Sequence, residues 1–79
     1  MMTLEDFTKN IEAEFEEITP GTITPTMNYR DIPGWSSMYA LIIIAFVDTN
    51  FDVQLNAADL KNAQTIQDLY QIVLTKKQA

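Results

Sequence analysis

The sequence predicts an all-α protein, a bundle of four helices with a long first connection and a short third helix. Apolar residues recur at steps of three and four over residues 4–18 and 66–73, which is the period of an amphipathic helix. All three prolines and both glycines lie in residues 20–35, where they predict a connection and not a helix. A chain of 79 residues has room for one modest core, so we expect a single domain over residues 1–79.

The first helix is predicted to begin at Thr3, which forms a capping box with Asp6. It is predicted to end before Pro20 and Gly21. Its apolar stripe consists of Leu4, Phe7, Ile11, Phe15 and Ile18. The connection that follows carries apolar side chains for packing across the helices, namely Ile23, Met27, Tyr29 and Ile32.

The second helix is predicted to begin at Ser36 or Ser37 and to run to about Asn50. The β-branched run within it favours a strand locally, but the length and the flanking residues favour a helix. A short third helix begins near Asn56 and carries Ala57, Leu60 and Ala63.

The last helix is predicted to open with a capping box of Thr65 and Asp68 and to end at Lys76 and Lys77. Basic residues in a final helical turn suit the helix dipole. Its apolar stripe consists of Ile66, Leu69, Ile72 and Val73.

Composition argues against an independent enzyme. The chain has no cysteine and no histidine, so thiolate metal sites, cysteine nucleophiles and the commonest general base are all excluded. Glu12 and Glu16 share a helix face, but beside Lys9 they are interpreted as a solvated surface and not as an acid–base pair. The acidic residues Asp48, Asp52 and Asp59 lack the spacing of a calcium loop, so no metal site is predicted.

The net charge of −6 disfavours nucleic acid as a partner and favours basic protein surfaces. Six of the eleven acidic residues lie in residues 1–19, with Lys9 as the only base there. No signal peptide is recognised at the N-terminus, and the longest apolar run is about half of the ~20 residues that a membrane span needs. We therefore expect a cytoplasmic protein that does not enter a membrane.

Three motifs follow one another at fixed distances. Residues 33–38 read Pro-Gly-Trp-Ser-Ser-Met, Phe51-Asp52 closes the second helix, and Thr65-Ile66 opens the last one. In this order and spacing, over the whole chain, the sequence resembles the acyl carrier protein family. The resemblance implies a four-helix acyl-carrier-like bundle in which Ser37 is the attachment site.

In that family, a phosphopantetheinyl transferase attaches 4'-phosphopantetheine from coenzyme A to the serine. The resemblance thus implies that Ser37 carries an acyl or aminoacyl thioester for fatty-acid, polyketide or related biosynthesis. The implied partners are the transferase and acyl-transferring or acyl-activating enzymes, and no catalytic residue of its own is needed.

Two positions depart from the family pattern. Ser36 stands where an aspartate is expected, and Met38 stands where a leucine is expected. Methionine conserves the volume of leucine, whereas the loss of the aspartate removes a charge that helps basic enzymes to dock. Two interpretations stay open: a specialised carrier with a dedicated transferase, or a relative without the prosthetic group that acts as an interaction subunit through its apolar second helix.

Every residue from Met38 to Val47 is apolar or tyrosine, so periodicity does not identify the buried face of this helix. Family geometry places Leu41, Ile43, Ile44 and Val47 toward the core. It places a partner-binding surface on the outside, formed by Tyr39, Ile42, Ala45 and Thr49 with Asp48 beside them.

The apolar outer face has two interpretations, either burial of Ile42 within the monomer or recognition of a partner or of a second copy. The expected state is a monomer or a weak homodimer. An attached acyl chain would lie between the helices, and ordinary core is the alternative role for each lining candidate: Met27, Leu41, Ile44, Val47, Leu60, Ala63, Ile66 and Leu69.

Overall fold

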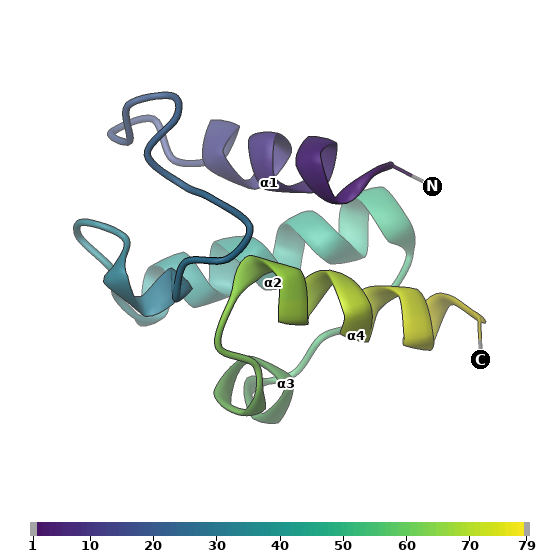
Figure 1. The fold of residues 1–79 in the computed structure, drawn as a ribbon. Helices are drawn as coiled ribbons and strands as arrows, with labels where there is room; N and C mark the ends of the chain where they lie inside the picture. Colours follow the sequence, from purple (N-terminus) through teal and green to yellow (C-terminus); the bar gives the residue numbers. More distant parts are fainter. Residues whose placement is uncertain (1, 79) are drawn as a thin grey trace.

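The protein forms four α-helices and one short 3₁₀ turn in the computed structural model, which describes residues 2–78. The α-helices are α1 (Leu4–Ala13), α2 (Ser37–Phe51), α3 (Ala57–Asn62) and α4 (Ile66–Gln78), and the 3₁₀ turn η1 covers Tyr29–Asp31 (Figure 1). The all-α class, the long first connection and the short third helix are thus confirmed.

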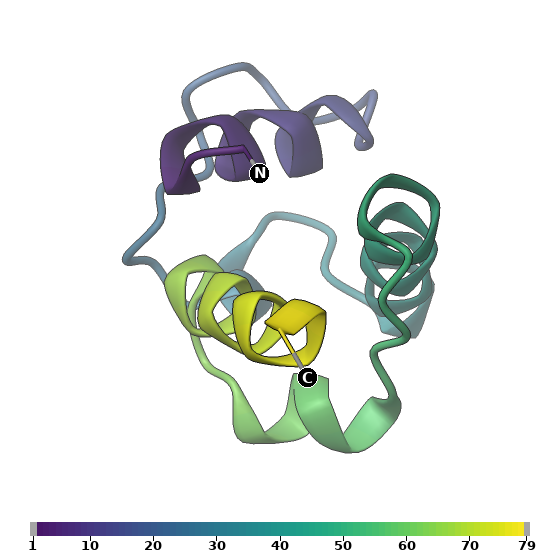
Figure 2. The ribbon, with the colours of Figure 1, turned by 90° about the vertical axis from the view of Figure 1, so that its right-hand side faces the viewer.

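Three long helices surround the core. Figure 1 shows that α2 and α4 run in the same direction and that α1 runs opposite to both. Figure 2 shows α3 below α4 and α2, across the open side of this arrangement. Each long helix supplies side chains with at most 1% of their surface exposed, namely Phe7, Ile11, Ile43, Val47, Leu69 and Val73.

The first helix is shorter than predicted. α1 ends at Ala13, and the chain continues through turns in which the amides of Glu14 and Phe15 donate to carbonyls three residues back. Phe15 and Ile18 are still buried, so the apolar stripe predicted burial correctly but not the helix end. The Glu12 carboxylate is bonded to the connection and not exposed along a longer helix.

Glu12 has a structural role that the sequence did not reveal. Its carboxylate accepts the backbone N–H of Gly21 at 2.9 Å and that of Ile23 at 2.8 Å. It therefore holds the connection against α1, and its interpretation as a solvated side chain is wrong. Glu16 is exposed, but it lies beyond α1 and does not share a helix face with Glu12.

The predicted helix starts are largely confirmed. Thr3 accepts the amide of Asp6 at 3.1 Å, which is one half of the predicted capping box. Thr65 and Asp68 form both hydrogen bonds of their predicted capping box, each 3.1 Å long. The amides of Thr65 and of its neighbour Gln64 both donate to the Asp68 carboxylate and hold its pKa below the ordinary value.

The first connection is tied to the junction of α3 and α4. Tyr29 is buried, and its hydroxyl donates to the carbonyls of Leu60 and Ala63 at the end of α3. The Arg30 guanidinium donates to the same two carbonyls at 2.7 and 3.2 Å. These donors satisfy carbonyls that a helix end leaves unpaired. Burial raises the pKa of Tyr29.

The far end of α2 is capped from α4. Asp52 takes a left-handed conformation with φ 56°, and the Lys77 ammonium donates to the carbonyl of Phe51 at 2.7 Å. A cation at the C-terminus of a helix is favourable because of the helix dipole. Both parallel helices are therefore fixed to each other at the end opposite Ser37.

Candidate functional site

Ser37 is the first residue of α2 and is exposed, as predicted. Ser36 is the N-cap with extended backbone, but its side chain makes no capping hydrogen bond. The first turn of α2 contains no acidic side chain. The unpaired amides and the positive end of the helix dipole thus favour an anion at this turn, and no carboxylate on the same turn opposes it.

The turn before Ser37 requires a glycine. Gly34 has φ +80°, a conformation that side chains rarely adopt, and the Trp35 amide donates to the Ile32 carbonyl at 3.0 Å. A Cβ atom on Gly34 would lie 3.3 Å from the hydroxyl oxygen of Tyr39. The Pro-Gly-Trp segment is thus a tight turn that brings the chain into α2.

A row of aromatic rings holds this turn in place. Tyr39 stacks on Phe15 with ring centroids 4.4 Å apart, and Trp35 meets Tyr39 edge-on at 6.1 Å. Trp35 also packs against Tyr29 at 5.2 Å. The backbone on both sides of Ser37 is therefore anchored while Ser37 itself faces outward.

The predicted outer face of α2 is partly wrong. Leu41 was expected in the core, but it is 63% exposed, and Met38 beside it is 64% exposed. Successive helix residues are rotated by about 100°, so Leu41 points almost opposite to the buried Ile43. The same geometry puts Tyr39 within about 40° of Ile43, on the core side.

The exposed stripe of α2 is therefore Met38, Leu41, Ala45 and Asp48, with Thr49 at its edge. We call it the α2 stripe. Ala45, Asp48 and Thr49 are exposed as predicted. Tyr39 and Ile42 are half-buried and pack against the core, so they expose less surface than the family geometry implies. Their predicted role in partner binding stays a prediction.

A hollow of about 520 Å³ lies between α2 and the segment that leads to α3. Leu41, Ile44 and Leu55 give it an apolar lining, and Asp48 is at its rim. Among the lining candidates from the sequence, Leu41 and Ile44 line this hollow, whereas Met27 is half-buried against the core. The others are ordinary core: Val47, Leu60, Ala63, Ile66 and Leu69.

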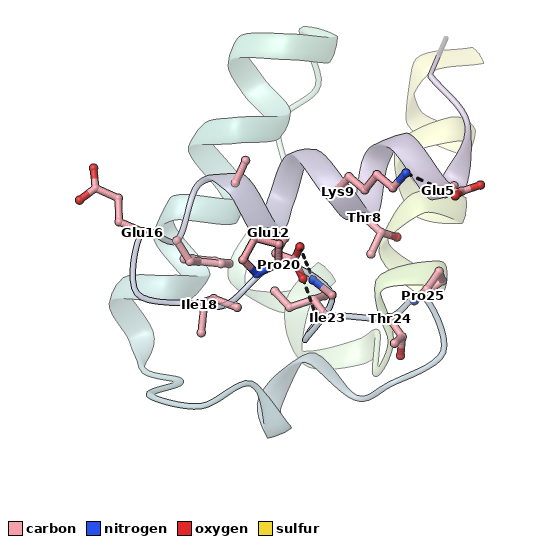
Figure 3. Close-up of a pocket in the computed structure, with 13 residues that line it drawn as sticks. Glu5, Thr8, Lys9, Glu12, Glu16, Ile18, Pro20, Ile23, Thr24 and Pro25 are labelled. Carbon is pink, nitrogen blue, oxygen red and sulfur yellow. Dashed lines mark hydrogen bonds and ion pairs between the residues drawn. The ribbon is translucent and has the colours of Figure 1, made fainter.

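A second hollow was not predicted. It is a groove of about 640 Å³ between α1 and residues 18–25 (Figure 3). Its formation depends on the early end of α1 and on the bonds from Glu12, neither of which the apolar pattern reveals.

No protein-family model matches the chain, and no curated protein matches it either. None of the helices in residues 2–78 is long and apolar enough to cross a membrane. Over the same residues, no group of three or more acidic side chains is placed to hold a metal ion.

Proposed function

We propose that this protein is a non-enzymatic carrier that bears 4'-phosphopantetheine on Ser37 and presents an acyl or aminoacyl thioester to partner enzymes in the cytoplasm. The observation that carries the proposal is the setting of Ser37. It is exposed at the start of α2, after a glycine turn that an aromatic row holds in place.

The chemistry requires only an accessible hydroxyl from this chain. In the transfer, the Ser37 oxygen forms a bond to the β-phosphorus of coenzyme A, and the pyrophosphate bond breaks to release adenosine 3',5'-bisphosphate. The transferase supplies the base that takes the hydroxyl proton. The amide-rich start of α2 favours the incoming phosphate and the phosphodiester that remains.

The surroundings of Ser37 support a carrier with narrow specificity. The α2 stripe begins next to Ser37 with two exposed apolar side chains and leads to the hollow that Leu41 and Ile44 line. An apolar acyl chain on the arm, or the apolar face of an enzyme, would be protected from water along this path. The four helices, the long first connection and the short third helix also fit what the resemblance implies.

Intact-mass measurement tests this proposal. The purified chain is incubated with coenzyme A and each of several phosphopantetheinyl transferases of different specificity. We expect a gain of one phosphopantetheinyl group, which Ser37→Ala abolishes and the matched variant Ser36→Ala retains. Absence of a gain with every transferase, or a gain that survives Ser37→Ala, would refute the assignment.

A second candidate is an interaction subunit without the prosthetic group. It is favoured by Ser36 in place of the family aspartate and by the exposure of Met38 and Leu41. The two functions differ in the mass of the chain isolated from its own cells. An unmodified mass in that preparation, together with no gain in the transferase assay, favours the interaction subunit.

A further inference from the structure

The groove between α1 and residues 18–25 is lined by residues that the core holds in place. Its floor contains Phe15, Ile18 and Ile23, each at most 8% exposed and fixed in the core. Its upper walls are short side chains and backbone, at Ala13 and Pro20. A volume of about 640 Å³ lies within the range of binding hollows in proteins, about 300–1,000 Å³.

The groove is held in shape before anything binds. The backbone N–H groups of Gly21 and Ile23, on one wall, donate to the carboxylate of Glu12 on α1, the opposite wall (Figure 3). Pro20 and Pro25 restrict the backbone of that wall. A partner would therefore meet a preorganised surface and lose little free energy in ordering it.

The rim of the groove is acidic. Glu5 and Glu16 line it against one cation, Lys9, which lies 3.5 Å from Glu5 in an exposed pair; the carboxylate of Glu12, already bonded to two amides, adds negative charge beside them. Such exposed pairs contribute little and exchange partners readily. The lining thus combines an apolar floor with a net negative rim, in the part of the sequence that holds most of the protein's acidity.

From this charge complementarity we infer that the groove is a docking site for a short basic amphipathic helix of a partner protein. Apolar side chains of the helix cover the floor, and Lys or Arg residues on its flanks approach Glu5 and Glu16. The helical part of the groove, from Glu5 to Ala13, spans about 12 Å, which matches about two turns of a docked helix.

Docking at this groove leaves the α2 stripe accessible. Figure 2 shows α2 on the right; the connection leaves α1 above it and then descends toward α4 on the left. The lining residues of the groove and those of the α2 stripe do not overlap. A partner bound at the groove would hold the protein in an assembly while Ser37 stays open to other enzymes. This inference does not require that Ser37 be modified.

The test uses the full chain and a synthetic peptide of about 14 residues, long enough for about four helical turns. The peptide has leucines at helical spacing with lysines on both flanks. Its control has glutamates in place of the lysines. Binding is followed by two-dimensional ¹H–¹⁵N NMR of the labelled protein.

We expect saturable shifts with the basic peptide at concentrations up to about 1 mM, centred on the amides of Ala13, Glu16 and Ile23. The acidic peptide should produce none. Glu16→Lys should weaken binding by about fivefold, whereas Glu17→Lys, an equal charge change on the adjacent residue outside the groove, should weaken it much less.

Shifts centred on Met38 and Leu41, equal binding of the two peptides, equal effects of the two charge reversals, or no binding would each overturn the inference. The Ser37→Ala variant separates it from the proposed function. That variant must bind the basic peptide like the natural chain, even though it accepts no prosthetic group.

Discussion

The carboxylate of Glu12 offers the sharpest test of how the first connection is held. Glu12→Gln keeps the size of the side chain but leaves one acceptor oxygen for the two amides of Gly21 and Ile23. The amide nitrogen of glutamine would then face one backbone N–H, donor against donor. One charge-assisted bond is lost outright, and the other loses its charge.

The magnitude follows from these two bonds. A hydrogen bond to a charged group contributes about 1.5–3 kcal/mol when it is well shielded. Glu12 is only half-buried, so we expect Glu12→Gln to lower the free energy of unfolding by about 1–2 kcal/mol. In a protein of this size, each kcal/mol corresponds to about 4–8 °C in the melting temperature.

Urea unfolding followed by the fluorescence of Trp35, the only tryptophan, measures the effect. Glu17→Gln is the matched control, because Glu17 is exposed and its change should stay within about 0.5 kcal/mol. Hydrogen exchange adds a local readout, in which the amides of Gly21 and Ile23 lose protection while the centre of α4 keeps it. Equal unfolding midpoints for the two variants, or unchanged exchange at both amides, would refute the role of Glu12.

Three further predictions address α2, the last helix and the turn before α2. Ile42→Glu should destabilise the protein by about 2 kcal/mol or more, because it places a carboxylate in a half-buried apolar site. Leu41→Glu, at an exposed site, should change stability by less than about 0.5 kcal/mol. Thermal unfolding followed by circular dichroism compares the two variants. Because the pKa of Asp68 is lowered in the folded state, the stabilisation from its carboxylate is complete above the ordinary pKa of 3.8 and is lost as the pH falls through the lower folded pKa. The urea midpoint should therefore fall less steeply from pH 6 to pH 2 in Asp68→Asn than in the natural chain. Gly34→Ala should lower the free energy of unfolding by about 1–3 kcal/mol, and by more than Gly21→Ala does. Both glycines have positive φ, but only a Cβ at position 34 would meet the hydroxyl of Tyr39. Equal losses in the two variants would contradict that contact.

Local signals predicted the helix starts well. Capping residues act within one turn of the chain, so Asn56 and Thr65 could be recognised from their own neighbours. The exposure of Ser37 follows in the same way, from a serine placed after a glycine turn and before an apolar run. These features depend on a few adjacent residues and need no knowledge of the tertiary structure.

Features that depend on distant contacts could not be predicted. The path of the chain after α1 is held by Glu12, which accepts amides nine and eleven positions later. The buried face of α2 is decided partly by Phe15, which stacks on Tyr39 from another segment. Periodicity contains no information about such partners, and in α2 it contains almost none about orientation, because nearly every side of the helix is apolar.

The orientation of α2 also bears on what its exposed side chains are for. The aromatic row fixes one end of the helix, Lys77 fixes the other, and Ile43 and Val47 fill the core between them. None of these contacts needs an apolar side chain at Met38 or Leu41, which face away from the core. A polar residue at either position would fold equally well and would reduce the tendency to aggregate. Their apolar side chains thus serve a contact outside the folded monomer better than they serve the core, and the carrier that we propose would supply such a contact through its cargo or through the enzymes that it serves.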